Sequence, residues 1–90
     1  MPARLQWDED RIEHIDQHQV DIEEVLDLYT SGNYHESRWE NSKKRLYGQT
    51  SSGRYLIVVV GKRRESRELW LVTAREMTPR EKRRYQRWRG

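Results

Sequence analysis

The 90-residue sequence contains no cysteine and has no apolar run long enough to cross a membrane. The absence of cysteine excludes disulfides, thiol chemistry and cysteine-ligated zinc. No apolar segment follows the first residues, so we expect no signal peptide, and a reducing cytoplasmic location fits. Hydrophobic residues make up only 33% of the chain, which limits the core to that of one small domain over residues 1–90.

Charge is abundant, and its two signs are separated along the sequence. Residues 1–36 carry two Arg against ten Asp or Glu, a net −8, and residues 37–90 carry sixteen Lys or Arg against five Glu, a net +11. The two halves can neutralise each other in part across the fold. The positive excess is larger, however, and it gathers in the last sixteen residues, where seven Lys or Arg accompany two Glu. We therefore expect a basic surface that binds a polyanion.

Capping residues predict two acidic helices near the N-terminus. Asp8 caps the first helix, which runs to about His18, and the acids that follow Asp8 suit the positive end of the helix dipole. Asp21 and Glu24 form a capping box at the start of the second helix, and Gly32 ends it.

A third helix is predicted at the C-terminus, and it is strongly basic. Thr78 caps it, Pro79 suits its first position, and Glu81 can close a capping box. Its arginines, which we expect to attract phosphates, are Arg80, Arg83, Arg84 and Arg87.

Between these helices the hydrophobic pattern changes to that of strands. Residues 44–50, 54–60 and 67–74 predict a three-stranded antiparallel meander, and residues 34–39 can add a short edge strand. The expected fold is therefore α+β, with two N-terminal helices, a three- to four-stranded antiparallel sheet and a C-terminal basic helix. The two N-terminal helices cover one face of this sheet, and the other face or an edge stays open for function.

Several stretches, in this order and at this spacing, resemble the BrnT family of ribonuclease toxins from bacterial type II toxin–antitoxin pairs. They are Trp7-Asp8-Glu9, Gln17-His18-Gln19-Val20, Glu23-Glu24-Val25, Gly48 to Arg54 and Thr73 to Thr78, followed by Glu81 and Tyr85. The resemblance implies a RelE-like fold over a single BrnT-like domain. The family commonly has Lys-His-Gly-Val where this chain has Gln17 to Val20. The chain thus lacks a lysine that can contact phosphate and a glycine that tolerates positive φ at a helix–helix corner.

The resemblance also implies RNA cleavage without a metal or cofactor. In such a reaction the 2′-hydroxyl attacks the adjacent phosphorus, which requires a proton shuttle and fixed cations. The implied catalytic residues are His18, Arg54, Arg75, Glu81 and Tyr85. We expect Arg54, at the start of one strand, and Arg75, at the end of the next, to converge beside His18.

Each of these residues also has a structural interpretation. Arg54 and Arg75 can pair with the acidic helices, and His18 can be a helix C-terminal residue favoured by the dipole. Glu81 can serve only as a cap, or it can orient Arg75 or act as a base. Tyr85 can bind phosphate, stack on a base, or cover the core with its ring.

The other histidines and the tryptophans carry weaker signals. His14 and His18 are four residues apart, but the glutamate of the zinc-protease motif is missing, so we expect no metal site. His35 is interpreted as a solvated loop residue. Trp39 and Trp88 can stack on bases, whereas Trp70, inside a strand, is expected to pack.

The leading hypothesis is a cytoplasmic ribonuclease toxin that a cognate antitoxin neutralises. The resemblance implies that this partner is a small BrnA-like protein with a DNA-binding domain, through which the toxin can also oligomerise. A nucleic-acid-binding module without catalysis, or an interaction protein assembled by its charge split, remains an alternative, because phosphate attraction carries no information about chemistry.

Overall fold

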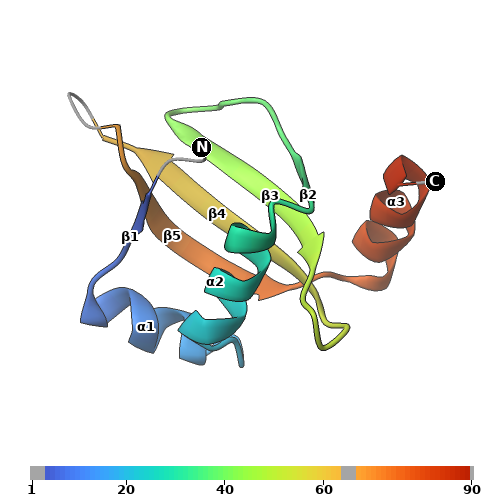
Figure 1. Ribbon diagram of the computed structural model, residues 1–90, viewed down its shortest axis with the longest axis horizontal. Helices are drawn as coiled ribbons and strands as arrows, with labels where there is room; N and C mark the ends of the chain where they lie inside the picture. The colour runs from blue at the N-terminus through green and yellow to red at the C-terminus, as the bar shows by residue number, and fades with distance from the viewer. Residues whose placement is uncertain (1–3, 64–66, 90) are drawn as a thin grey trace.

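The computed structural model describes residues 4–63 and 67–89, in which three helices pack on a five-stranded sheet (Figure 1). The elements follow in the order β1 (Leu5–Gln6), α1 (Glu9–Asp16), α2 (Ile22–Ser31), β2 (Tyr34–Glu36), β3 (Lys43–Gln49), β4 (Tyr55–Lys62), β5 (Leu69–Glu76) and α3 (Pro79–Arg89). The α+β class and the order of the elements agree with the sequence prediction.

The sheet has the strand order β1-β5-β4-β3-β2. Strands β2 to β5 form the expected antiparallel meander. Strand β1 adds a fifth, parallel strand, which pairs Leu5 with Leu69 and Gln6 with Trp70. The prediction of three to four antiparallel strands missed β1 because two residues are too few to show an alternating pattern.

One face of the sheet packs against α1 and α2 and holds the main core. Leu56, Val58 and Val60 of β4 point to this face, where they join residues such as Ile15 and Leu28 from the two helices. Helix α2 approaches β3 so closely that a Cβ atom on Gly48 would lie 2.9 Å from Cδ1 of Leu28. A larger residue at position 48 would therefore require the side chain of Leu28, or α2 itself, to shift.

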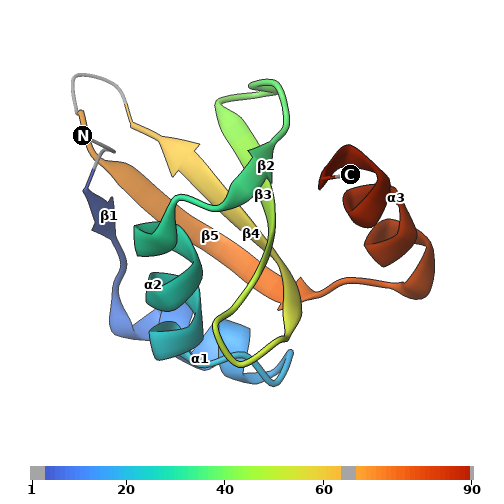
Figure 2. The same cartoon turned by 45° about the vertical axis from the view of Figure 1, so that its right-hand side comes forward.

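The opposite face of the sheet carries α3, so that the sheet separates α3 from α1 and α2 (Figure 2). Tyr85 of α3 is 1% exposed and packs with Ile57 and Met77 in a second, smaller cluster. The face that was expected to be open is thus partly covered by the basic helix.

The predicted caps are present at the N-terminal helices. The side chain of Asp8 accepts a hydrogen bond from the backbone N–H of Arg11. Asp21 and Glu24 form the capping box, and Gly32 ends α2 in the left-handed conformation, with φ 69°. These contacts confirm that local capping chemistry sets where both helices begin and where α2 ends.

The corner between α1 and α2 also has a left-handed residue, but it is not glycine. Gln19 has φ 60°. This is the position at which the family resemblance predicts a glycine, and a residue with a Cβ adopts this conformation only at a conformational cost.

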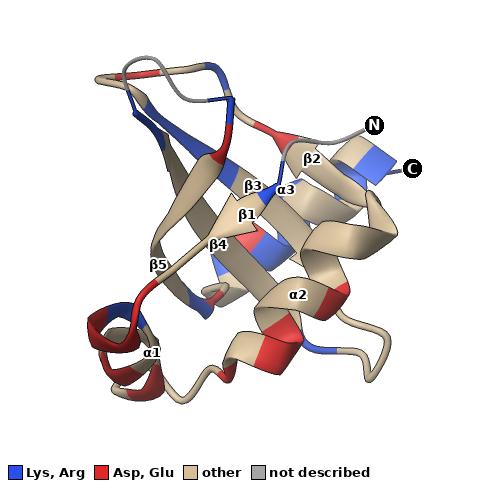
Figure 3. Ribbon diagram, turned by 60° about the vertical axis from the view of Figure 1, so that its left-hand side comes forward, with Lys and Arg blue, Asp and Glu red and all other residues tan. Residues whose placement is uncertain are grey.

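The charge split of the sequence becomes a separation in space. Asp and Glu gather on α1 and α2, whereas Lys and Arg lie mainly on the strands and on α3 (Figure 3). Among residues 4–63 and 67–89, no helix is long and apolar enough to span a membrane.

Candidate nucleic-acid interface

A groove of about 330 Å³ lies between α3 and the sheet face on which α3 packs. Its lining combines basic, aromatic and hydroxyl side chains, namely His35, Ser37, Arg45, Tyr47, Glu81, Arg84 and Trp88. We refer to this site as the α3 groove.

Strand alternation explains why these side chains meet. His35 of β2 pairs with Tyr47 of β3, while the adjacent pair, Tyr34 and Gly48, faces α2. His35, Arg45 and Tyr47 therefore point to the α3 side of the sheet. The last turns of α3 then bring Arg84 and Trp88 over the same strands.

Aromatic stacking shapes one end of the groove. The rings of His35 and Trp88 are stacked, with centroids 4.0 Å apart and an interplanar angle of 18°. Tyr47 meets Trp88 edge-on at 5.3 Å, and the guanidinium of Arg84 lies 5.5 Å from the Trp88 ring. Trp88 nevertheless keeps 42% of its surface exposed. The groove thus presents a partly exposed Trp88 ring beside Arg45 and Arg84. Sites that bind single-stranded nucleic acids commonly combine an aromatic ring, on which a base stacks, with basic side chains that contact phosphate.

A second basic cavity of about 260 Å³ shares Ser37 and Arg45 with the α3 groove. It is lined further by Lys43, Lys44 and Arg38 from β3 and the segment before it. The basic surface therefore continues from α3 across β3, in the direction that an extended polyanion can follow.

Glu81 and Arg75 form a bidentate ion pair at the wall of the groove. Arg75 donates to the two carboxylate oxygens of Glu81 at 2.7 and 2.8 Å. The hydrogen bond from Arg75 is the main reason why the pKa of Glu81 is lowered to about 2, and the same contact raises the pKa of Arg75. At neutral pH this carboxylate is ionised and a weak base, so its geometry favours orienting Arg75 over accepting a proton.

Glu81 also closes the predicted capping box. It accepts from the backbone N–H of Thr78 at 2.9 Å, and its own N–H donates to the Thr78 hydroxyl at 3.2 Å. The capping and orienting interpretations of Glu81 thus describe the same carboxylate.

Arg54 does not converge with Arg75, contrary to the sequence expectation. Arg54 donates to Glu24 of α2 at 2.8 Å and to the backbone carbonyl of Gln19, and it lies 3.4 Å from Glu76. Its hydrogen bond with Glu24 raises its pKa. In the β4–β5 register Glu76 pairs with Leu56 on the core side.

Arg75, in contrast, pairs with Ile57, which packs against α3. The two guanidinium groups therefore lie on opposite faces of the sheet. Arg54 pairs with Glu24 of the acidic helix α2, as its structural interpretation predicted. Arg75 was also expected to pair with the acidic helices in that interpretation, but it pairs with Glu81 of α3.

His18 lies in the exposed turn after α1. Its ring contacts that of His14, with centroids 5.4 Å apart, and Nε2 of His14 lies 3.0 Å from the Thr73 hydroxyl. Within residues 4–63 and 67–89, no hydrogen bond joins His18 to either Arg54 or Arg75. In the same part of the chain no three His, Cys, Asp or Glu side chains gather as a metal site requires.

The remaining candidates divide between core and surface. Tyr85 is buried, and its hydroxyl accepts from Arg89 at 3.4 Å, so its ring covers the core and is not open to stacking. Arg80, Arg83 and Arg87 are exposed on α3. Trp39 is exposed beside Lys44, whereas Trp70 is half-buried beneath Arg63.

Sequence reasoning interpreted His35 as a solvated loop residue and did not consider Arg45. His35 belongs to β2 rather than to a loop, and it contacts a tryptophan 53 positions later in the chain. Because Arg45 and Tyr47 are two residues apart in one predicted strand, their positions alone could have predicted that both side chains point to the same face. The register of a three-residue edge strand, however, leaves no such signal.

The fold matches a solved structure. The crystal structure of the Brucella abortus ribonuclease toxin BrnT superposes with a TM-score of 0.67 over 84% of this chain and 97% of that chain, at 16% sequence identity. No protein-family model and no curated protein matches the sequence. The chain therefore has a BrnT-like fold.

Proposed function

We propose that this chain is a ribonuclease toxin that binds single-stranded RNA in the α3 groove and cleaves it there. The observation that carries the proposal is the convergence of an imidazole, two arginines and an exposed indole in one groove of a BrnT-like fold. The function of the Brucella protein supports the proposal by analogy of fold.

In the proposed reaction Arg45 and Arg84 bind the phosphate and Trp88 stacks on a flanking base. His35 accepts the proton of the 2′-hydroxyl as O2′ bonds to phosphorus. The P–O5′ bond breaks, the 5′-oxygen takes a proton from water, and His35 returns its proton to the solvent, leaving a 2′,3′-cyclic phosphate. Arg75, held by Glu81, adds positive charge next to the developing negative charge. No metal takes part in this scheme.

The proposal includes a cognate antitoxin. An acidic or shape-matched segment that covers the α3 groove would prevent RNA from entering. By analogy with the family, the proposed partner is a BrnA-like protein with a DNA-binding domain, which can link toxin copies into an oligomer. The proposed site of action is the cytoplasm.

The test is cleavage of RNA by the purified protein in the presence of EDTA. We expect fragments that end in 2′,3′-cyclic phosphate, and we expect His35→Asn to lower the rate by about 10²-fold or more. His18→Asn is the matched control, because it also removes an imidazole but lies in the turn after α1. His18→Asn should retain most of the activity.

Two results would contradict this proposal. Loss of cleavage in His18→Asn but not in His35→Asn would move the catalytic site to the turn after α1. RNA that stays intact while it binds in the groove would make the protein a binding module without catalysis.

A further inference from the structure

A second groove, of about 430 Å³, lies on the other side of the molecule, between α1 and α2. We propose that it is a docking site for a basic amphipathic segment of a partner protein, with aliphatic side chains on its floor and Lys or Arg at its rim. We refer to it as the α1–α2 groove. This inference does not depend on the ribonuclease proposal.

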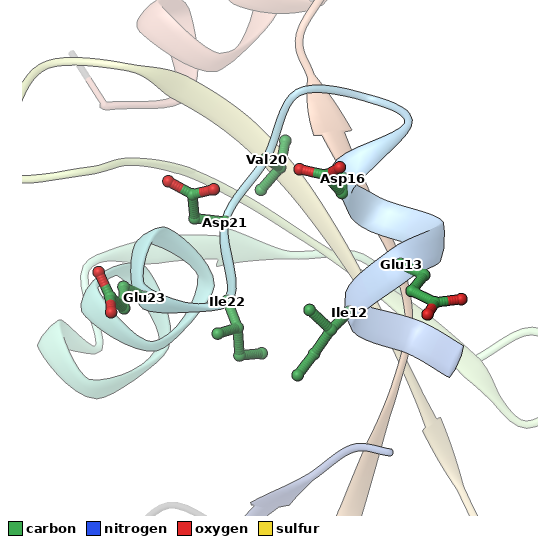
Figure 4. Close-up of a pocket in the computed structure, with 7 residues that line it drawn as sticks. All are labelled: Ile12, Glu13, Asp16, Val20, Asp21, Ile22 and Glu23. Carbon is green, nitrogen blue, oxygen red and sulfur yellow. The ribbon is translucent and has the colours of Figure 1, made fainter. Parts of the chain in front are cut away.

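The floor of the α1–α2 groove is apolar. Ile12 of α1 and Ile22 of α2 face each other across it, and Val20 lies at its end (Figure 4). The side chains of both isoleucines are partly exposed to solvent, whereas Val20 is only 1% exposed. An aliphatic side chain placed between them would bury apolar surface from both sides.

Acidic side chains surround this floor, and three of them have no partner. Glu13, Asp16, Asp21 and Glu23 line the groove (Figure 4). Asp21 is used in the capping box of α2. The carboxylates of Glu13, Asp16 and Glu23 form no hydrogen bond or ion pair with any residue in the described parts of the chain.

Several acidic residues elsewhere in the described parts of the chain are held in structural contacts, unlike the three at this rim. Glu24 binds Arg54, Glu81 binds Arg75, and Asp27 accepts from the N–H and hydroxyl of Ser51. A chain with an excess of positive charge thus leaves the rim of one apolar groove unneutralised. Lysine or arginine on a partner would complement that charge.

A second copy of this chain is a poor occupant. Its basic helix, α3, buries Tyr85 in its own core, stacks Trp88 on His35 of its own sheet, and offers no aliphatic side chain with its arginines. The charge and apolar pattern of the groove therefore fit a segment of a different protein, in which leucine-type and basic residues alternate at helical spacing.

The experiment uses a fluorescent 14-residue peptide of leucines and lysines with all leucines on one helical face. A scrambled peptide of the same composition is the first control. By fluorescence anisotropy we expect the amphipathic peptide to bind at least about fivefold more tightly than the scrambled one, because only it can fill the floor. NMR shift changes on binding should centre on residues 12–23.

The protein variants separate the rim from general charge attraction. Glu13→Lys/Asp16→Lys reverses two rim charges and should weaken peptide binding by about tenfold. Glu9→Lys/Glu40→Lys has the same net charge but leaves the groove lining intact, and its affinity should stay within about twofold of the unsubstituted chain. All four positions are exposed, so both proteins should fold.

The inference is overturned if the two variants bind the peptide equally, if the scrambled peptide binds as tightly, or if the shifts map to α3. It is also overturned if the chain alone dimerises in sedimentation and Glu13→Lys/Asp16→Lys abolishes the dimer. A second copy would then occupy the groove.

Discussion

At the scale of single residues, Gln19 shows how a local sequence departure is tolerated. Its φ of 60° puts a Cβ-bearing residue in the left-handed region, at the corner between α1 and α2. Its backbone carbonyl still accepts a hydrogen bond from Arg54, which helps to fix the corner. Backbone hydrogen bonds of residue 19 help to offset the conformational free energy of this positive φ. Any residue at position 19 would keep them, because they involve no side-chain atom of that residue.

Gln19→Gly should therefore stabilise the protein. We expect the free energy of unfolding to rise by about 0.5–1 kcal/mol, because glycine adopts positive φ without a Cβ clash. Urea unfolding followed by circular dichroism measures the change. Gln17→Gly is the control, since Gln17 has φ −62° and glycine there should destabilise by a few tenths of a kcal/mol up to about 1 kcal/mol. Equal effects of both substitutions would contradict this account.

Single residues also show what the sequence could and could not predict. Capping residues such as Asp8, Asp21 and Thr78 act within one turn, so their positions alone located the helix starts. The expectation that Arg54 and Arg75 converge was wrong. It was based on the order of the strands and did not take into account which face of the sheet each side chain points to. Adjacent ends of antiparallel strands place side chains on the same face only when the register pairs them.

At the scale of elements, α3 is the part on which the proposed RNA site depends. Strand β5 leads into it across only Met77 and Thr78, and the Arg75–Glu81 pair joins the strand to the first turn of the helix. The small cluster around Tyr85 holds the helix on the sheet. Glu81 thus links the start of the helix, the sheet and the groove.

The stability contributed by Glu81 should depend on pH. Its pKa is about 2 in the folded protein against an ordinary value of 4.5, so the unfolded chain binds the proton first as the pH falls. Its contribution is full above about pH 4.5 and is lost as the pH approaches 2.

Glu81→Gln should cost on the order of 1 kcal/mol at pH 7, since Arg75 is partly exposed and solvent screens the pair. The difference from the unsubstituted protein should shrink between pH 4.5 and 2 in thermal unfolding. Glu36→Gln is the control. It removes the ion pair between Glu36 and Lys44, and it should have a smaller effect because the side chain of Glu36 is more exposed than that of Glu81. A difference that does not change with pH would show that the ion pair is not its cause.

Sequence reasoning missed the shortest element, β1, and gave β2 only as a possible edge strand over residues 34–39. β1 has two residues and β2 has three, and neither is long enough for alternation to reveal a face or a register. His35 is in the α3 groove only because β2 pairs with β3 in one specific register. The long strands and capped helices were predictable from local pattern, whereas the groove depends on contacts between distant residues.

At the scale of the whole molecule, the sheet separates two oppositely charged layers. The acidic helices α1 and α2 lie on one face, and α3 with its groove lies on the other (Figures 2 and 3). The charge split is therefore not cancelled by contact between the two ends of the chain. Arg54 is a local exception, since it neutralises Glu24 beside the core.

RNA binding should fall steeply with added salt, because each neutralised phosphate releases counterions. Arg45→Gln/Arg84→Gln should reduce the slope of log affinity against log salt by about 1.4, at roughly 0.7 per contact with single-stranded RNA. The matched control is Arg4→Gln/Arg63→Gln, which removes two exposed charges outside the groove and should leave the slope nearly unchanged. Identical slopes in the two double variants would contradict the α3 groove as the RNA site.

The tight contact at Gly48 has an evolutionary consequence. A methyl group at this position would collide with Leu28, so a homologue with a larger residue there must turn or shorten the facing side chain, or shift its second helix away from the sheet. Substitutions at these two positions should therefore occur in pairs among sequences that keep this helix–sheet packing.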